Sequence, residues 1–231
     1  MIFRQLFDES TWTYTYLIAD ESTGEAVLID PVLEKAPLYR KLLRELSLQI
    51  IYAIDTHVHA DHITALGALR EEYGCLTVHG EGSEAACVSK FVADREILKV
   101  GKLELEAIST PGHTSDSYCF VLKTDGPAFL FSGDTLLIRG TGRTDFQNGD
   151  AALQFDSLKE KILTLPNDTI LYPGHDYQGM TQSTIGEEKL HNPRLQVADK
   201  KAYIKMMREL DLPNPKFMDV AVPANLKCGD E

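Results

Sequence analysis

The stretch Thr56-His57-Val58-His59-Ala60-Asp61-His62 holds four potential metal ligands within six residues. It follows the apolar run 50–54, which predicts a buried strand. Residues two apart in an extended segment point to the same side, so His57 and His59 can converge on one point. The chain then enters a predicted helix, where Asp61 and His62 can face a neighbouring point. A hydrophobic core does not need this density of ligands, so the stretch indicates a metal site.

Three later segments repeat a pattern in which a strand ends in a turn that carries a histidine or an aspartate. They are Thr110-Pro111-Gly112-His113, Ser132-Gly133-Asp134 and Pro173-Gly174-His175-Asp176. Each segment alone is weak evidence for a metal site, because a single turn histidine usually lies on the surface and a strand-end aspartate is usually a cap or turn residue. Together they strengthen the metal-site hypothesis, since functional residues gather on loops that a rigid scaffold holds at one edge.

Composition narrows the class of protein. The 231 residues fit one domain, and acidic residues outnumber basic ones 35 to 23, which gives a net charge of -12. This charge argues against nucleic acid as a partner, because phosphate binding relies on an excess of Lys and Arg. No apolar run approaches the roughly 20 residues of a membrane span, and the first ten residues lack the features of a secretory signal. We therefore expect a cytoplasmic protein that does not bind membranes.

The four cysteines form no C-x-x-C pair, so we expect reduced thiols, with Cys119 in the core.

Strand-like runs come in groups rather than in strict alternation with helices, which favours two mixed sheets packed together with helices outside. The predicted strands are 14–18, 27–30, 50–54, 76–79, 103–108, 118–122, 128–131 and 169–172. Helices are predicted around Leu38, Leu42 and Leu46, from Ile63 to about Gly74, and over 151–165 with Asp150 as N-cap. From about residue 181 we expect a short C-terminal helical extension of a single domain, 1–231, with an irregular tail after Pro213.

The order His-x-His-x-Asp-His, turn histidine, strand-end aspartate and last histidine resembles that of the metallo-β-lactamase superfamily. This resemblance spans residues 57–175 and implies an αββα sandwich of class α/β with the metal site at one edge of the sheets. It does not give the reaction, because the superfamily includes hydrolases, nucleases and oxygen-using enzymes.

A narrower resemblance comes from the segments 56–64, Leu-Ile-Arg-Gly-Thr-Gly-Arg-Thr-Asp-Phe-Gln at 137–147, Tyr-Pro-Gly-His-Asp-Tyr at 172–177, and Asn-Pro-Arg at 192–194. Together these segments resemble the persulfide dioxygenases, the ETHE1-like sulfur dioxygenases. Some members carry a fused rhodanese domain, for which we expect no room after Arg194.

This second resemblance implies one iron(II) per chain, held by His57, His113 and Asp134. Two histidines and one carboxylate leave coordination positions open for the substrate sulfur and for O₂. The resemblance further implies that the iron is surrounded by groups that orient ligands and waters, namely His59, Asp61, His62, His175 and Asp176. The implied reaction converts glutathione persulfide, O₂ and water into sulfite and glutathione.

Glutathione carries two carboxylates, which a guanidinium binds in a fork geometry. The candidates for substrate contact are Arg139, Arg143 and Arg194, together with the hydroxyl of Tyr177. Arg143 could equally pair with Asp145 or Asp176, and Tyr177 could be a packed aromatic. His79 and His191 lie outside every motif and are expected not to be ligands. The sequence leaves the oligomeric state open, with a homodimer as one expectation.

The alternative function is a dinuclear zinc hydrolase resembling glyoxalase II, in which metal-bound hydroxide attacks a thioester. Every ligand that such a site needs is present, so the metal ligands do not separate the two functions. The short C-terminal extension and the sequence Arg-Thr-Asp-Phe-Gln after Gly142 favour the dioxygenase. The negative charge disfavours a nuclease, and a binding module without catalysis would not need so many convergent ligands.

Overall fold

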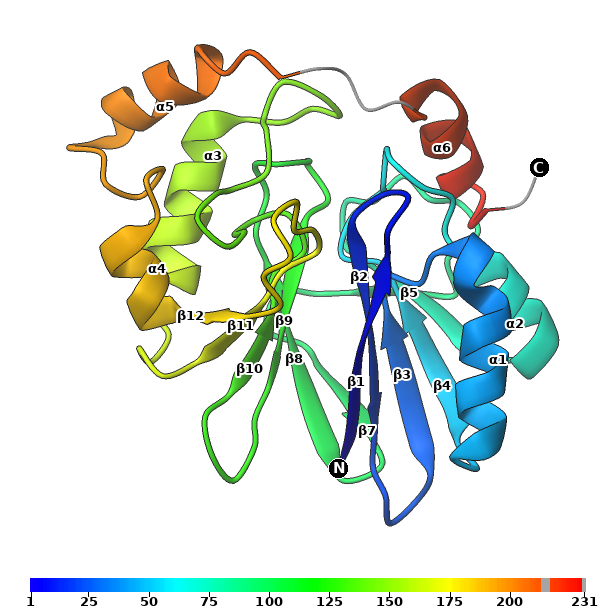
Figure 1. Cartoon of the computed structure of the whole chain (residues 1–231). Helices are drawn as coiled ribbons and strands as arrows, with labels where there is room; N and C mark the ends of the chain where they lie inside the picture. Colours follow the sequence, from blue (N-terminus) through cyan, green and yellow to red (C-terminus); the bar gives the residue numbers. More distant parts are fainter. Residues whose placement is uncertain (213–216, 230–231) are drawn as a thin grey trace.

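The structure, a computed structural model, describes residues 1–212 and 217–229. Two six-stranded mixed sheets face each other, and helices cover both outer sides (Figure 1). This confirms the expected αββα sandwich. None of the helices in the described ranges is long and apolar enough to cross a membrane.

The first sheet takes its strands in chain order. They are β1 (Ile2–Asp8), β2 (Thr13–Ala19), β3 (Glu25–Ile29), β4 (Gln49–Ile54), β5 (Leu76–Gly80) and β6 (Lys90–Val92). The pairs from β1 to β3 are antiparallel, and those from β3 to β6 are parallel. Parallel neighbours need crossover connections, which here contain η1 (Leu33–Lys35) with α1 (Ala36–Glu45), and α2 (Leu66–Tyr73). These helices cover the outer face of the sheet (Figure 1).

The second sheet has the order β12-β11-β10-β9-β8-β7. Its strands are β7 (Ile97–Val100), β8 (Leu103–Ser109), β9 (Tyr118–Leu122), β10 (Phe129–Phe131), β11 (Ile170–Tyr172) and β12 (Ser183–Thr184). Only β10 and β11 are parallel, and their crossover holds α3 (Ala151–Asp156) and the π-helical η2 (Ser157–Ile162). Helices α4 (Ile185–His191) and α5 (Lys200–Arg208) lie on the same outer side (Figure 1).

Strand β2 shows how the layers pack, because every one of its residues is buried. Tyr16 and Ile18 lie in the core between the sheets, whereas Leu17 and Ala19 pack in the cluster that includes residues of α1 and α2. Alternate side chains of β2 thus pack on opposite faces of the sheet, and both faces are buried. Burying a side chain such as Leu or Ile contributes about 1.5–3 kcal/mol, so the double burial makes β2 a strong anchor of the fold.

Two local predictions are confirmed by their caps. Asp150 accepts hydrogen bonds from the backbone N–H groups of Ala152 and Leu153 at the start of α3. Gly74 ends α2 with φ +68° and donates to the carbonyl of Arg70, a conformation that favours glycine. Helix α1 is present as expected, but its buried side chains include Tyr39 and Leu43, while Leu38 is 37% exposed.

The C-terminal region corrects the sequence-based expectations. Residues 213–216 lie outside the described part, but Met218–Asn225 forms helix α6, so the expected irregular tail is wrong there. The sequence of α6 did not predict a helix, because Pro223 lies inside it. Most of the stability of such a short helix comes from tertiary contacts. Residues 183–184 form β12, although this region was expected to be helical.

The expectation of reduced thiols is also wrong, since Cys87 and Cys228 form a disulfide across 141 residues. Their Cα atoms lie 5.8 Å apart, a proximity that only the tertiary fold creates. Cys75 and Cys119 are free and buried, and burial raises the pKa of each thiol to about 11. The core position of Cys119 is therefore confirmed.

Strand direction decides where the histidines gather. β8, β10 and β11 run the same way, because β9 is antiparallel to both β8 and β10 while β10 and β11 are parallel. Their carboxyl ends therefore meet at one edge, hereafter the histidine edge. The backbone N–H of Tyr118 donates to the carbonyl of Thr56, which joins this edge to the end of β4.

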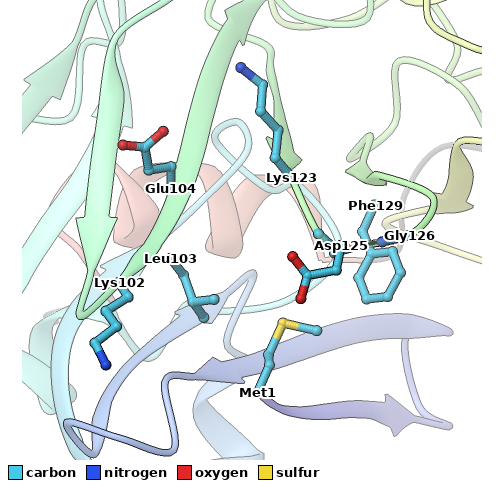
Figure 2. A pocket seen from close by; sticks show the side chains of 9 residues that line it. Met1, Lys102, Leu103, Glu104, Lys123, Asp125, Gly126 and Phe129 are labelled. Atoms are coloured by element: carbon cyan, nitrogen blue, oxygen red, sulfur yellow. Dashed lines mark hydrogen bonds between the residues drawn. The ribbon is translucent and has the colours of Figure 1, made fainter.

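The other end of the sandwich, hereafter the turn edge, holds the β2–β3, β7–β8 and β9–β10 turns. A groove of about 670 Å³ lies there, lined by Met1, Lys102, Leu103, Glu104, Lys123, Thr124, Asp125, Gly126 and Phe129 (Figure 2). These residues come from the first residue of the chain and from the β7–β8 and β9–β10 turns. The groove is thus separate from the histidine edge.

Candidate metal centre

Three of the predicted ligands meet at the histidine edge. His57 follows β4, His113 follows β8 and Asp134 follows β10, and one ligand atom from each lies within 4.8 Å of the others. The Nε2 atom of His113 is 3.7 Å from Oδ2 of Asp134, and the rings of His57 and His113 are 4.9 Å apart. The structure therefore brings together the three side chains that the sequence predicted as iron ligands. We call them the triad.

The second nitrogen of each triad histidine is held by the protein. Nδ1–H of His113 donates to the backbone carbonyl of Arg143 at 2.6 Å. Nδ1 of His57 lies 3.0 Å from the hydroxyl of Thr56, which itself donates to Asp30. Because the hydroxyl of Thr56 donates its hydrogen to Asp30, it accepts a hydrogen bond from Nδ1–H of His57. Both rings thus keep the lone pair on Nε2 for a metal, as histidine ligands with a fixed outer partner do.

Two glycines let the loops approach this closely. Gly133 has φ +49°, and a Cβ there would lie 2.5 Å from the hydroxyl oxygen of Thr56. A Cβ on Gly142 would lie 2.7 Å from the ring of His113. Only glycine fits both positions without displacing the side chains that carry or support the ligands.

The triad has the charges that a divalent cation prefers. Burial, together with neighbouring His59 and His113, holds the pKa of His57 well below its usual 6.5, so the ring is neutral. Burial alone would raise the pKa of Asp134, but the charge and hydrogen bond of His175 lower it well below 3.8. At neutral pH the site offers imidazole nitrogens and an ionised carboxylate.

A second group lies beside the triad and consists of His59, Asp61 and His62, whose ligand atoms also lie within 4.8 Å of one another. Nδ1 of His62 is 3.0 Å from Oδ2 of Asp61. Nε2 of His59 is 3.1 Å from Oδ1 of Asp30. Burial alone would lower the pKa of His59, but Asp30 raises it to about 9. Each of these two imidazoles thus has one nitrogen beside a carboxylate, while the other nitrogen, Nδ1 of His59 or Nε2 of His62, has no hydrogen-bond partner among the described residues.

His175 connects the two groups. Its Nδ1 lies 2.7 Å from Oδ1 of Asp134, and its Nε2 lies 3.0 Å from Oδ2 of Asp61. Burial alone would lower the pKa of His175, but the two carboxylates raise it well above 6.5. Both ring nitrogens thus donate to carboxylates, and His175 orients Asp134.

Unpaired polar atoms support a cation at this edge. Among the described residues, five buried side-chain atoms lack a hydrogen-bond partner. Two of them, His59 Nδ1 and His62 Nε2, belong to the second group, whereas Asp55 Oδ2 and His79 Nε2 lie 3.5 Å from each other. An unpaired buried polar group costs about 1–3 kcal/mol, so such a cluster indicates a site that a ligand completes. Nitrogen and carboxylate donors suit a transition metal, and the residues fit the expected ion.

The three candidate arginines are all bound to protein acceptors. Arg139 forms ion pairs with Glu187 and the fully buried Glu188. Arg194 donates to the backbone carbonyl and the hydroxyl of Thr141. The structure does not test whether either contacts substrate, so these roles stay predictions.

Arg143 pairs with Asp145, with contacts of 2.7 and 2.8 Å, which realises one of the two pairings left open by the sequence. Its guanidinium also lies 4.3 Å from the centre of the Phe146 ring. Since its carbonyl holds His113, Arg143 links the triad to the outer loop.

Tyr177 and Asp176 follow His175 in the same turn. The Tyr177 ring is 62% exposed and stacks on His175 with 6.1 Å between centroids. Asp176 accepts from the backbone N–H groups of Gln178 and Met180, so it stabilises the turn. Within the described residues, His191 belongs to no group of ligands, and neither does His79.

Three supporting residues were missed in the sequence. Asp30 binds both Thr56 and His59, and Oδ2 of Asp116 accepts from the backbone N–H of Val58. The hydroxyl of Thr13 lies 3.1 Å from Oδ2 of Asp61. Asp30 had a usable signal, because it stands at the end of an apolar strand-like run, and Asp134 lies shortly after another. Thr13 and Asp116 had none.

Comparisons with known proteins agree with this geometry. The family model described as "Metallo-beta-lactamase superfamily" matches residues 13–175. The human protein "Persulfide dioxygenase ETHE1, mitochondrial" is 46% identical over 230 residues, covering 99% of this chain and 89% of the human protein. The crystal structure of ETHE1 from Myxococcus xanthus is 50% identical with a TM-score of 0.96, covering 100% of both chains.

A hydroxyacylglutathione hydrolase from Polaromonas sp. is 38% identical over 178 residues, covering 73% of this chain and 66% of that protein. This likeness is both lower in identity and shorter in extent than that to the persulfide dioxygenases. The chain therefore belongs to the metallo-β-lactamase superfamily and, within it, to the persulfide dioxygenase family.

Proposed function

We propose that this protein is a ferrous-iron persulfide dioxygenase that converts glutathione persulfide, O₂ and water into glutathione and sulfite, with one iron per chain. The observation that carries the proposal is the triad, in which His57, His113 and Asp134 direct three ligand atoms to one point. Two histidines and one carboxylate on one face are typical of non-haem iron oxygenases. The similarity to named persulfide dioxygenases supports the same substrate class.

The reaction is balanced when one persulfide, one O₂ and one water give one thiol, one sulfite and two protons. The outer sulfur loses four electrons to O₂, and the sulfur–sulfur bond breaks to release glutathione. A ferrous ion would supply the redox chemistry with O₂ that protein side chains lack. The chain itself fixes the ligand geometry through Thr56 and the carbonyl of Arg143, and His175 keeps Asp134 oriented.

The contrast between the two groups supports one metal rather than two. In the triad, Oδ2 of Asp134 and Nε2 of His113 lie 3.7 Å apart, too far for a hydrogen bond between them. In the other group, Asp61 already lies within 3.0 Å of nitrogens of His62 and His175. A metal there would have to break these contacts before it gained its own.

The dinuclear zinc hydrolase remains the second candidate, because His59, Asp61 and His62 do lie close enough to share an ion. His59 Nδ1 and His62 Nε2 are also without a hydrogen-bond partner. A thioester of glutathione would be its substrate class.

For the substrate carboxylates we propose Arg143, with Tyr177 at the rim of the site. Arg143 is joined to the triad through its own carbonyl, and Tyr177 stacks on His175. Arg139 and Arg194 would have to exchange protein partners for substrate, so we propose them as the outer part of the same binding region.

Location and assembly are further proposals. We propose a cytoplasmic protein and a homodimer, in which residues 1–231 act as one unit. The human relative carries the word mitochondrial in its name, which makes fractionation of the native cell the direct test. Light scattering of the purified protein would test the dimer.

The decisive experiment loads metal-free protein with ferrous iron under anaerobic conditions and follows O₂ uptake after glutathione persulfide is added. We expect uptake with one sulfite per O₂, and none after loading with zinc. If the zinc form instead hydrolyses a glutathione thioester and the iron form consumes no O₂, the protein is a hydrolase and the second group binds metal.

A further inference from the structure

Helix α6 contributes a residue that none of the motifs contains. Asn225 is fully buried, and its side chain binds three backbone groups of the segment 59–64. Its Nδ2 donates to the carbonyls of His59 at 2.9 Å and His62 at 2.8 Å, and its Oδ1 accepts from the N–H of Thr64 at 2.9 Å. An amide side chain has two donor hydrogens, and both are used here on one turn.

This turn lies between the first triad ligand and helix α2. It carries His59, Asp61 and His62, and the ring of His59 packs 4.3 Å from the ring of His57. Just before the turn, Asp116 accepts from the N–H of Val58 at 3.1 Å. Asn225 and Asp116 therefore hold the ligand-bearing segment between two separate elements.

The end of the chain is fastened beside this turn by further contacts. The carbonyl of Cys228 accepts from the N–H of Gly67 in α2, and the carbonyl of Leu226 accepts from the N–H of Ala86. The Cys87–Cys228 disulfide adds a covalent link between the segment after α6 and the loop after β5. A Cβ on Gly229 would lie 2.2 Å from the carbonyl oxygen of Thr64, so the segment packs directly on the turn.

We propose that Asn225 is a positioning residue of the metal site, which holds the turn 59–64 in place, and that the Cys87–Cys228 disulfide keeps α6 docked for this purpose. The inference rests on the proposed metal site but not on the identity of the metal. Asn225 lies 161 to 166 residues from its partners and outside residues 13–175, which the family model matches. Asn225 is fully buried and its amide binds backbone groups of the turn, so it acts through the geometry of the ligands.

The test compares metal release from three variants with that from the native protein. Asn225→Leu keeps the size of the side chain and removes all three hydrogen bonds. Ala221→Gly weakens α6 one turn earlier, at another fully buried position, and leaves the three bonds intact. The double variant Cys87→Ser/Cys228→Ser keeps Asn225 but removes the covalent link.

Release is followed by competition with a chelator, in parallel for ferrous iron and for zinc. We expect Asn225→Leu to release metal about 10–100-fold faster, the range seen when a partner of a metal ligand is lost. The double variant should release it several-fold faster, whereas Ala221→Gly should lower the melting temperature with little change in release. If Asn225→Leu does not fold, metal release from the double variant still tests whether docking of α6 positions the metal site.

Release at the native rate from Asn225→Leu and the double variant would overturn the positioning role. An increase in Ala221→Gly that matched its loss of stability would equally reduce Asn225 to a structural residue. A native protein that holds zinc but not ferrous iron would contradict the proposed function, while the zinc arm would still test Asn225.

Discussion

The two edges of the sandwich differ in how their polar groups are paired. At the turn edge, Asp20 accepts from the backbone N–H groups of Lys102 at 2.7 Å and Ser22 at 2.8 Å, and Glu25 accepts from the N–H of Gly101. At the histidine edge, two buried ring nitrogens in the described part of the chain, His59 Nδ1 and His62 Nε2, have no hydrogen-bond partner. The same scaffold thus places satisfied hydrogen bonds at the turn edge and buried polar atoms without a partner at the histidine edge.

This difference shows where the fold gives up stability for function. Each unpaired buried group costs about 1–3 kcal/mol, so the histidine edge is unfavourable by itself. A metal that binds only the native state offsets such a cost, by about 2.7 kcal/mol at a concentration 100 times its Kd. Substitutions at the histidine edge should therefore change metal binding and activity, whereas those at the turn edge should change stability alone.

The largest effect is expected for Asp134→Ala. The change removes the carboxylate of the triad and leaves His175 without one of its two partners. We expect loss of iron retention and of O₂ uptake to the detection limit, measured by metal analysis and an oxygen electrode. Asp125→Ala at the turn edge is the matched control and should keep both. An active, iron-loaded Asp134→Ala protein would end the assignment of the triad.

A smaller effect is expected for His59→Ala. His59 lies beside the triad without belonging to it, so a site with one metal should keep iron with an affinity lowered about 10–100-fold. Metal content after dialysis and the Kd for ferrous iron are the measurements. If the native protein holds two metals per chain and His59→Ala loses one of them, the dinuclear alternative is correct.

Arg143→Ala should alter substrate binding more than chemistry. If its guanidinium binds a glutathione carboxylate, KM should rise about 10–100-fold, equivalent to about 1.5–3 kcal/mol, with kcat less affected. Its carbonyl is unchanged by the substitution, so the bond to His113 remains available. Asp145→Ala removes the ion-pair partner of the same guanidinium and serves as the comparison. An unchanged KM in Arg143→Ala would leave Arg143 with a structural role only.

The smallest effect is expected at the turn edge, for Asp20→Asn. Hydrogen bonds from the backbone N–H groups of Lys102 and Ser22 lower the pKa of Asp20 to about 2 from 3.8. Since the folded pKa is the lower one, the stabilisation is present above about pH 4 and is lost as the pH falls from 4 to 2. Asp20→Asn should flatten the pH dependence of the melting temperature in that window. It should leave the iron Kd unchanged, and a changed Kd would mean that the two edges are coupled.

The candidate site was predictable to a large extent, because its ligands are local signals. His57, His113 and Asp134 each lie within a few residues of the end of a strand-like run, and the structure brings them together. The outer partners were less accessible. Asp30 shares the strand-end position, but nothing in the sequence says that it binds His59 rather than solvent. Helix α6 was missed because Pro223 and a weak apolar pattern conceal it.

Residue type and spacing over a few positions were enough to predict a metal site and the caps at Asp150 and Gly74, and the family resemblance added the candidate ligands. Contacts between distant residues could be read from the tertiary structure alone: Arg139 binds Glu188, Cys87 meets Cys228, and Asn225 binds the turn after His57. These contacts join residues 49, 141 and 166 positions apart. Periodicity and capping report only on neighbours within a helix or strand, whereas distant pairs are fixed by how the two sheets and their helices pack.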